Sequence, residues 1–306
     1  MSRYVQCLSF SVKPARVACG SVLSIMSMQN IHTHVLEAAL HMTPECVQEA
    51  DLSRGYPLDL TVRFDAFMKD MAPFDRVAVF GLKARRTGWW VSDDYIARFV
   101  AQAPGKLVGF ASCDPSQPGH MEELKYAVET LKLSGLKLGP IYSGVDPRDP
   151  ICDPVYRYCQ ERGLPVLFHT GTTYNRCAPL ELGRPGIVDE VAMRYPGLRI
   201  VLAHVGHPWC EECLVTIRKH PNLYADISAL YYRPWQFYNM LIAAQEYKVT
   251  HKLLFGTDYP FAGAADSIAG LRNVNRVTGT SGLPLVADSV IEDILTRDAF
   301  GLLGIK

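Results

Sequence analysis

Short apolar runs alternate with longer stretches of helical patterning along most of this chain. The runs hold Val, Ile, Leu and Phe at consecutive positions, which is typical of parallel strands buried on both faces. Eight such runs occur, at Asn30–His34, Arg76–Phe80, Leu107–Ala111, Gly135–Leu138, Pro165–His169, Arg199–His204, Leu223–Ile227 and Lys252–Phe255. Strand and helix alternating eight times predicts an α/β fold, a (β/α)8 TIM barrel. A doubly wound open sheet is the alternative, but no Gly-rich phosphate loop follows the first run.

The segments between the runs support the barrel and indicate where its covers lie. Amphipathic stretches occur at Met121–Leu133, Pro154–Arg162, Val188–Tyr195 and Pro234–Tyr247. We predict a last helix over Asp288–Leu303, with Ile291, Ile294, Leu295 and Leu302 lying over the barrel. The segment Leu36–Pro57 is too long for a tight loop, so we expect it to cover part of the active-site face.

Length and charge limit what the chain can be. Its 306 residues suffice for one large barrel or two ordinary domains. We assign residues 29–306 to a single catalytic barrel and residues 1–28 to an N-terminal extension that we expect to be poorly ordered. Lys+Arg and Asp+Glu both number 31, so no net charge favours nucleic acid or an anionic membrane as a partner. No segment approaches the roughly 18 uninterrupted apolar residues of a membrane span.

Cysteine usage suits a reducing compartment, and we predict a cytoplasmic protein. The nine cysteines are an odd number and are scattered, unlike a disulfide framework. Cys210 and Cys213 form a C-x-x-C, but no second pair completes a four-sulfur zinc site, so we interpret them as ordinary helix residues. The expected partner is a small-molecule substrate. A homo-oligomer is left open, because the sequence indicates no interface.

Histidines and an acid stand where the predicted strands end. His32 and His34 alternate in the first strand and therefore share a face, while His169, His204 and Asp258 end three later strands. Each alone is more often a hydrogen-bonded structural residue or a turn residue. Together they lie at the face where barrels build active sites, which favours a first shell for a divalent metal such as zinc, with room for water.

Other residues near the strand ends are candidates for binding the substrate. Arginine beside aromatic rings suits a planar or cyclic carboxylate, because the guanidinium binds the carboxylate in a fork and the rings stack on the substrate. The candidates are Arg176, Arg233, Tyr142 and Trp209. The alternative is that these aromatic residues only pack the loops. Lys137, within the fourth run, could be a core lysine paired with an acid.

Five segments, taken in order, resemble the amidohydrolase superfamily in the branch called amidohydrolase-related or amidohydrolase 2. That branch includes metal-dependent hydrolases and the aminocarboxymuconate-semialdehyde decarboxylase group. The segments are Ile31–His34, Gly135–Leu138, Phe168–Gly171, Leu202–Gly206 and Phe255–Pro260, and the similarity spans about residues 28–303. One departure is Asn30, because the family usually has an acidic residue before the H-x-H. We expect Asn30 to support the first strand.

The resemblance implies a role for each matching residue. The ligands of one divalent metal ion, with zinc expected, would be His32, His34, His169 and Asp258. Asp258 would also contact the water that the metal activates, and His204 would stand beside the metal as the acid/base group or as the group that polarises a carbonyl. Lys137 would be a supporting residue. In the binuclear branches the matching lysine is carbamylated and bridges two metals, so that role is the alternative for Lys137.

Three functions remain open at this point. The leading hypothesis is a metal-dependent hydrolase, in which metal-activated water attacks an amide, lactone or related bond of a small carboxylated molecule. The alternative is a non-oxidative, metal-dependent decarboxylase (a lyase) of an aromatic or unsaturated dicarboxylic acid. A second alternative is a barrel that binds metal or ligand without turnover. The metal ligands alone do not separate hydrolysis from decarboxylation.

Overall fold

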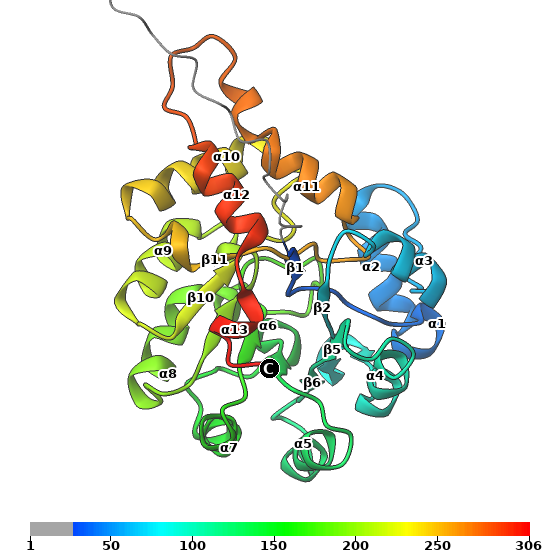
Figure 1. Ribbon diagram of the computed structural model, residues 1–306. Helices are drawn as coiled ribbons and strands as arrows, with labels where there is room; N and C mark the ends of the chain where they lie inside the picture. Colours follow the sequence, from blue (N-terminus) through cyan, green and yellow to red (C-terminus); the bar gives the residue numbers. More distant parts are fainter. Residues whose placement is uncertain (1–26) are drawn as a thin grey trace, which may run out of the picture.

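A ring of short parallel strands surrounded by helices forms the body of the protein (Figure 1). The computed structural model describes residues 27–306. The strands of the ring are β1 (Gln29–Asn30), β2 (Arg76–Val79), β5 (Leu107–Gly109), β6 (Ala111–Ser112), β7 (Leu136–Leu138), β8 (Val166–Phe168), β9 (Ile200–Leu202), β10 (Leu223–Asp226) and β11 (Leu253–Leu254). They pair in two sheets, in the orders β1–β2–β5 and β6–β7–β8–β9–β10–β11.

The two sheets meet at both of their edges. Phe110 alone separates β5 from β6, so β5 and β6 act as one strand position. At the other edge, the Ile31 N–H donates to the carbonyl of Phe255 at 3.0 Å, and the Asp258 N–H donates to the carbonyl of His32 at 2.9 Å. All eight predicted strand positions are therefore filled, and the predicted α/β TIM barrel is confirmed.

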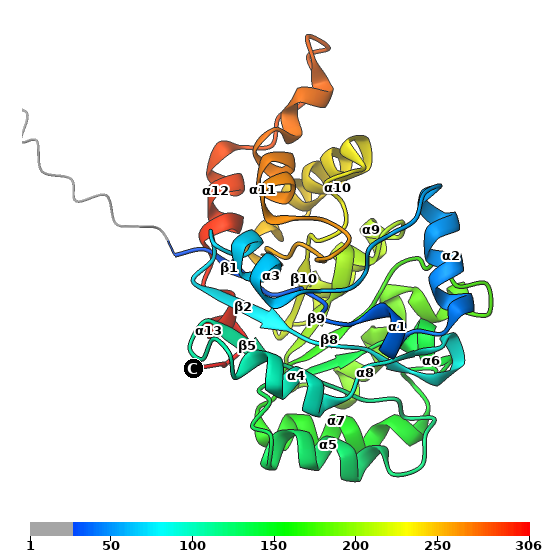
Figure 2. The same ribbon diagram turned by 90° about the vertical axis from the view of Figure 1, so that its right-hand side faces the viewer.

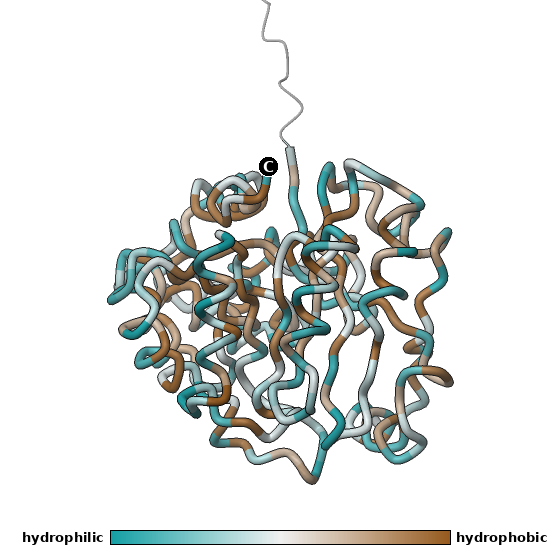
Figure 3. The backbone as a smooth tube through the Cα atoms, turned by 90° about the horizontal axis from the view of Figure 1, so that it is seen from below, coloured by the Kyte–Doolittle hydropathy of each residue, from teal (hydrophilic) through white to brown (hydrophobic). Residues whose placement is uncertain are grey.

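Helices cover the outside of the ring. They are α3 (Phe64–Asp70), α4 (Asp93–Val100), α5 (His120–Glu129), α7 (Asp153–Arg162), α8 (Val188–Arg194), α9 (Cys210–Lys219), α10 (Pro234–Glu246), α11 (Ala264–Arg272) and α12 (Asp288–Thr296). Hydrophobic and hydrophilic residues alternate around their turns, as expected of helices with one face on the strands (Figure 3). Three shorter or separate helices are α1 (Ala38–His41), α2 (Pro44–Arg54) and α6 (Pro140–Ser143). Figure 2 shows β2 pointing toward the side on which α1 and α2 lie.

Apolar side chains from alternate strand positions fill the inside of the ring. They are Ile31, Ala78, Phe80, Val108, Phe110, Leu167, Val201 and Leu254. Phe300 in α13 (Ala299–Leu302) joins them, and the guanidinium of Arg76, the first residue of β2, lies 4.4 Å from the centre of its ring. The amino end of the barrel is therefore closed by apolar packing. Polar side chains inside the ring gather at the carboxyl end.

The predicted last helix, Asp288–Leu303, is wrong in its continuity. The chain forms α12 and α13 instead, because Arg297 is extended and Asp298 caps α13 by accepting the N–H of Gly301 at 3.0 Å. Leu302 is 38% exposed, and Leu303 is buried in its place. The bend directs α13 across the end of the barrel.

The first predicted strand and one inserted hairpin also differ from expectation. Regular pairing in β1 ends at Asn30, and beyond it only Thr33 and His34 make isolated bridges. The hairpin of β3 (Lys83–Ala84) and β4 (Trp89–Trp90) is antiparallel and has no counterpart in the predicted pattern. It brings the ring of Trp89 to 5.4 Å from that of His34. The insertion therefore contributes to the carboxyl end of the barrel.

Three sequence-based predictions concern the ends and the cysteines. Residues 1–26 lie outside the described residues, so the predicted extension over 1–28 is described only at Ser27 and Met28. Within residues 27–306, no helix is long and apolar enough to cross a membrane. The cysteines of this part are free, and Cys210 and Cys213 lie in α9 as ordinary helix residues.

Candidate active site

A cavity of about 420 Å³ opens at the carboxyl end of the strands. Side chains from strand ends line its inner part: His34, Lys137, His169, His204 and Asp258. We call these five, with the buried His32 beneath them, the floor. Residues from loops, α2, α6 and the hairpin strand β4 form the walls: Ser53, Arg54, Leu82, Trp89, Tyr142, Thr172, Thr173, Tyr174, His207, Ala229, Tyr232, Arg233 and Phe261. Ser53 and Arg54 belong to the segment Leu36–Pro57, which was expected to cover this face.

The floor brings metal-binding atoms together from distant parts of the chain. The Nε2 of His32 lies 3.3 Å from the Nε2 of His34 and 3.3 Å from Oδ1 of Asp258. His34 Nε2 lies 3.6 Å from the same oxygen. The ligand atoms of a tetrahedral site with bonds near ~2.1 Å lie about 3.4 Å apart, so these three atoms fit around one divalent cation.

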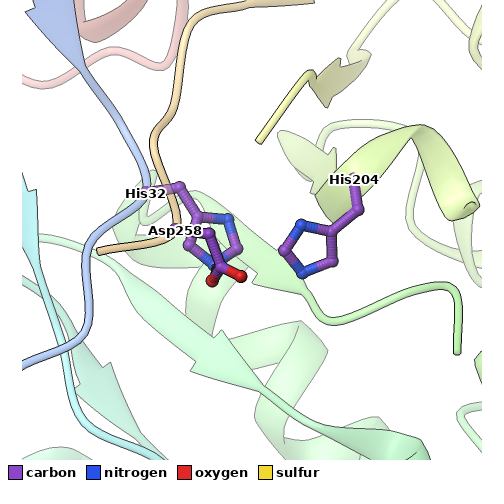
Figure 4. A group of neighbouring side chains, drawn as sticks. All are labelled: His32, His204 and Asp258. Carbon is purple, nitrogen blue, oxygen red and sulfur yellow. Dashed lines mark ion pairs between the residues drawn. The ribbon is translucent and has the colours of Figure 1, made fainter. Parts of the chain in front are cut away.

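His204 joins this group as a further candidate ligand. His32, His204 and Asp258 each offer a ligand atom, and these atoms lie within 4.8 Å of one another. Figure 4 shows the three side chains converging from three separate segments. The predicted ligand His169 lies beside them, with its ring 5.0 Å from that of His204. Its Nε2 lies 3.2 Å from the carbonyl oxygen of Thr172, so the loop after β8 holds this ring.

Lys137 stands directly beside a predicted ligand. Its Nζ lies 3.3 Å from the Nε2 of His32 and 4.8 Å from the centre of the Phe80 ring, and the side chain is fully buried. Burial lowers the pKa of this amine to about 8, although Asp226 and Asp258 act in the opposite sense. The position is compatible with the supporting role and with the bridging role that the resemblance implies.

Burial sets the charge state of the floor in the absence of a cation. It lowers the pKa of His32, His34 and His204 well below the usual range and that of His169 to about 3. It also raises the pKa of Asp258 to about 8. The imidazoles are therefore neutral at pH 7, which is the form that binds metal. A cation would favour the ionised carboxylate of Asp258 and restore the charge that burial removes.

Two buried residues that sequence reasoning missed hold these histidines. Asp226, the last residue of β10, lies 2.8 Å from the Nδ1 of His32 through Oδ2. Ser228 Oγ lies 2.8 Å from the Nδ1 of His204, and its hydroxyl also contacts Asp226. An acid that ends an apolar strand, two residues before a serine on the same face, is the signal in the sequence.

The backbone of the floor is tightly constrained. His204 has φ 58° and Asp258 has φ 67°, a left-handed conformation that non-glycine residues adopt mainly where surrounding contacts hold it. The His204 N–H donates to Asp226 at 3.1 Å. A Cβ at Gly256 would lie 2.7 Å from the Cβ of His32, so only glycine lets the segment after β11 pass this close to His32.

Asn30 has a structural explanation. Its Oδ1 accepts the N–H of Thr257 at 3.1 Å and the N–H of His32 at 3.2 Å. Its Nδ2 donates to the Thr257 hydroxyl at 3.0 Å. A carboxylate could accept the first two bonds but could not donate the third. The amide therefore ties β1 to the segment that carries Asp258, and it supports the strand as expected.

The candidate substrate-binding residues divide into two pairs. Tyr142 and Arg233 line the cavity, but Arg176 and Trp209 do not. The loop after β8 turns Thr172 to Tyr174 toward the cavity, while Arg176 is exposed and its N–H bonds the carboxylate of Glu49 at 3.4 Å. Trp209 packs under the guanidinium of Arg184, 5.6 Å from the ring centre, at the start of α9.

A second arginine, which sequence reasoning missed, accompanies Arg233. Arg54, the last residue of α2, donates to the hydroxyl of Tyr232 at 3.0 Å. Its guanidinium lies 4.4 Å from the centre of the Tyr232 ring, and that of Arg233 lies 4.5 Å from the same centre. We call these three residues the mouth. A lone arginine at the end of a helix carries no sequence signal of its own.

A sequence profile of one family, described as Amidohydrolase, matches residues 30–303 of this chain. That range includes the whole floor. The chain belongs to the amidohydrolase family. The resemblance found in the five short segments is thereby confirmed over nearly the whole barrel.

Among curated proteins, this chain is similar to 2-amino-3-carboxymuconate-6-semialdehyde decarboxylase of Dictyostelium discoideum, at 26% identity. The match covers 37% of this chain and 36% of the relative, so it spans about a third of that relative's length.

Solved structures of similar fold cover nearly the whole chain. An uncharacterised TIM-barrel protein of Bordetella bronchiseptica has a TM-score of 0.69 at 19% identity, covering 91% of this chain and 98% of its own. The 5-carboxyvanillate decarboxylase of Sphingomonas paucimobilis has a TM-score of 0.65 at 16% identity, and the match covers 92% of this chain and 100% of that protein. A probable 2-pyrone-4,6-dicarboxylic acid hydrolase of Acinetobacter baumannii has a TM-score of 0.64 at 16% identity, and the match covers 92% of this chain and 100% of that protein. A dihydroxybenzoic acid decarboxylase of Polaromonas, solved with bound manganese, has a TM-score of 0.63 at 16% identity. The match covers 91% of this chain and 97% of that protein. At these identities the likeness concerns the fold.

Proposed function

We propose that this protein is a non-oxidative, metal-dependent decarboxylase of a planar aromatic or unsaturated acid that carries a second acidic group. The observation that carries the proposal is the cavity itself, with metal-binding atoms at its floor and two guanidinium groups at its mouth. The curated relative and two of the similar structures are named decarboxylases, which favours this function over the hydrolase hypothesis.

The floor fits one divalent cation, and zinc or manganese would suit its donor set of nitrogen and oxygen. The residues that would hold the cation are His32, His34, His169 and Asp258, with His204 beside them or completing the set. When bound, the cation would stabilise negative charge that develops on the substrate. Lys137, buried next to His32, would add positive charge close to the end of the substrate on which this negative charge develops.

Proton transfer is the part of the reaction that this chain's own side chains can perform. Ser228 engages the Nδ1 of His204, so Nε2 is the nitrogen left to exchange a proton in the cavity. Asp258 is a second group that can accept and pass on a proton there, because its carboxylate lies at the same floor, 3.3 Å from the Nε2 of His32. One of them, after taking up a proton from water, delivers it to the carbon that bears the carboxylate. The carbon–carbon bond then breaks, its electron pair returns to the conjugated system, CO₂ leaves, and water replaces the proton.

The mouth selects the substrate. A carboxylate or other acidic group remote from the reacting carbon can bind Arg54 and Arg233. The distance between floor and mouth would then place the other end of a rigid, planar molecule at the floor. A small-molecule substrate in a cytoplasmic enzyme is part of the same proposal, as is a homo-oligomer.

Hydrolysis remains the second candidate, because a similar structure is named a hydrolase of a pyrone dicarboxylic acid and the floor serves both reactions. The test is an assay of Zn²⁺- or Mn²⁺-loaded protein against hydroxybenzoates, muconate-type acids and lactones. We expect CO₂ release, and a loss of about 10²- to 10⁴-fold in kcat in His204→Gln. Ring opening without CO₂ would support the hydrolase instead. Ligand binding without any product would support a non-catalytic barrel.

A further inference from the structure

One buried carboxylate contacts two histidines of the floor. Asp226 is fully buried, and its Oδ2 lies 2.8 Å from the Nδ1 of His32. Its Oδ1 accepts the backbone N–H of His204 at 3.1 Å, the backbone N–H of Ser228 at 3.0 Å, and the hydroxyl of Ser228. Both oxygens are thus engaged inside the protein, by groups that directly follow β1, β9 and β10.

The direction of each hydrogen bond follows from what the groups can donate. A carboxylate accepts only, so Nδ1 of His32 carries the proton that it shares with Asp226. A serine hydroxyl has one proton, and in Ser228 this proton points to Asp226. The Ser228 oxygen can then only accept, from the Nδ1 of His204 at 2.8 Å and more weakly from the Nδ1 of His32 at 3.3 Å.

A second acceptor points to the same state of His204. The backbone carbonyl oxygen of Ser228 lies 3.3 Å from the Nδ1 of His204, and a carbonyl cannot donate. A neutral imidazole carries one proton, so a proton on Nδ1 leaves Nε2 bare. The bare Nε2 of His32 is the atom that faces His34 and Asp258 at 3.3 Å.

We propose that Asp226 is a positioning residue that fixes His32 directly, and His204 through Ser228, as Nδ1–H tautomers with both Nε2 lone pairs aimed into the floor. The inference deepens the proposed function, on which its catalytic meaning rests. A histidine ligand needs its lone pair free, and a proton carrier needs a fixed ring. One carboxylate thereby couples the metal-binding side of the floor to the proton-transfer side.

The isosteric variant Asp226→Asn tests the direct contact. The position of Oδ1 faces two backbone N–H groups, which cannot reverse, so the amide oxygen must stay there. The amide nitrogen must then face the Nδ1 of His32 and donate to it. His32 can accept this bond only by moving its own proton to Nε2. The variant should therefore switch His32 and leave the backbone bonds in place.

The variant Ser228→Ala tests the relay to His204. It removes the acceptor at 2.8 Å and leaves only the carbonyl at 3.3 Å. We expect a mixture of tautomers at His204. His32 should be unchanged, because it loses only a contact of 3.3 Å to Ser228 and keeps its acceptor Asp226 at 2.8 Å. The matched control is Ser267→Ala, because Ser267 is a fully buried serine whose hydroxyl bonds the Gly263 carbonyl, away from the floor. It should leave both rings as they are.

The measurement is a long-range ¹H–¹⁵N spectrum of metal-free, ¹⁵N-histidine-labelled full-length protein, which separates Nδ1–H from Nε2–H imidazoles. His32→Gln and His204→Gln assign the two signals. We expect both rings as Nδ1–H in the unmodified protein, a switch of His32 in Asp226→Asn, and Zn²⁺ binding about 10- to 100-fold weaker in that variant by chelator competition. If Asp226→Asn does not fold, the unmodified protein and Ser228→Ala decide the matter.

An Nε2–H signal from either histidine in the unmodified protein overturns the inference. An unchanged His32 in a folded Asp226→Asn protein overturns it as well. The spectrum reads the tautomers whether or not the protein turns over a substrate. Two Nδ1–H rings in a protein that releases no CO₂ would therefore overturn the proposed function alone.

Discussion

The floor and the mouth of the cavity are built in different ways. The floor consists of buried side chains at the ends of barrel strands, each held by neighbours such as Asp226, Ser228 and Asn30. The mouth consists of Arg54, Tyr232 and Arg233, which are partly or largely exposed and lie on α2 and on the segment before α10. A rigid floor suits chemistry, which tolerates little displacement, and an exposed mouth suits recognition.

Because the chemistry takes place at the floor, we expect the largest loss of activity when the metal is removed from it. Dialysis against a strong chelator should reduce CO₂ release by more than about 10³-fold, because the cation supplies charge stabilisation that the neutral histidines cannot. Zn²⁺ or Mn²⁺ added back should restore it, and elemental analysis should give one ion per chain. Full activity in chelator-treated protein with no bound metal would contradict the metal-dependent function.

Acid should destabilise the metal-free floor. Its buried histidines are His32, His34, His169 and His204, and burial lowers the pKa of each. They stay neutral when folded but titrate near ~6.5 when unfolded, so the unfolded state gains protons, and stability falls, as the pH drops from about 7 to about 5.5. Asp258 opposes this, since its folded pKa is raised to about 8 and its unfolded pKa is near ~3.9.

Four histidines outweigh one carboxyl group in this interval. We expect a net loss of roughly 3 kcal/mol of unfolding free energy, about 5 kcal/mol from the four histidines together less about 2 kcal/mol from Asp258. Urea unfolding of the metal-free protein at the two pH values measures it. Greater stability at the lower pH would show that the floor is not held neutral by burial.

A smaller change within the floor tests its rigidity. In Gly256→Ala the new methyl group would collide with the Cβ of His32, and neither backbone can move freely. We expect a loss of about 1–3 kcal/mol in stability, together with weaker Zn²⁺ binding. Gly197→Ala is the comparison, because Gly197 is exposed and the atom nearest to the added carbon is the end of the Gln160 side chain, at 3.2 Å. Normal metal affinity in Gly256→Ala would mean that His32 tolerates displacement.

The mouth should respond in KM rather than in kcat. Arg54→Met and Arg233→Met each remove a guanidinium that can bind the remote acidic group, and we expect KM to rise about tenfold with kcat changed less than about threefold. Steady-state kinetics with the preferred acid measures both. A large fall in kcat with an unchanged KM would place these arginines in the chemical step and erase the distinction between floor and mouth.

The smallest effect should come from Arg176→Met. The side chain lies outside the cavity, although the sequence made it a candidate for carboxylate binding. We expect KM and kcat within about twofold of the unmodified protein. A tenfold rise in KM would restore the sequence-based assignment and show that the loop after β8 rearranges when substrate binds.

The barrel and most of the floor could be predicted from the sequence because both leave a one-dimensional trace. Buried parallel strands need consecutive apolar residues, and a histidine or acid at the end of such a run stands out against them. His32, His169, His204 and Asp258 are visible in this way. Asp226 carries the same signal but was missed, since its partners His32 and His204 are distant in sequence.

The sequence by itself determined the fold class, the family and the residues that meet at the floor. Only the tertiary structure decided that Arg54 joins Arg233 while Arg176 and Trp209 stay outside, because loop and helix-end side chains follow no period. It also decided the role of Asn30, whose amide both accepts and donates between β1 and the segment after β11. Contacts between distant segments have no pattern along the chain, since they depend on how the barrel closes.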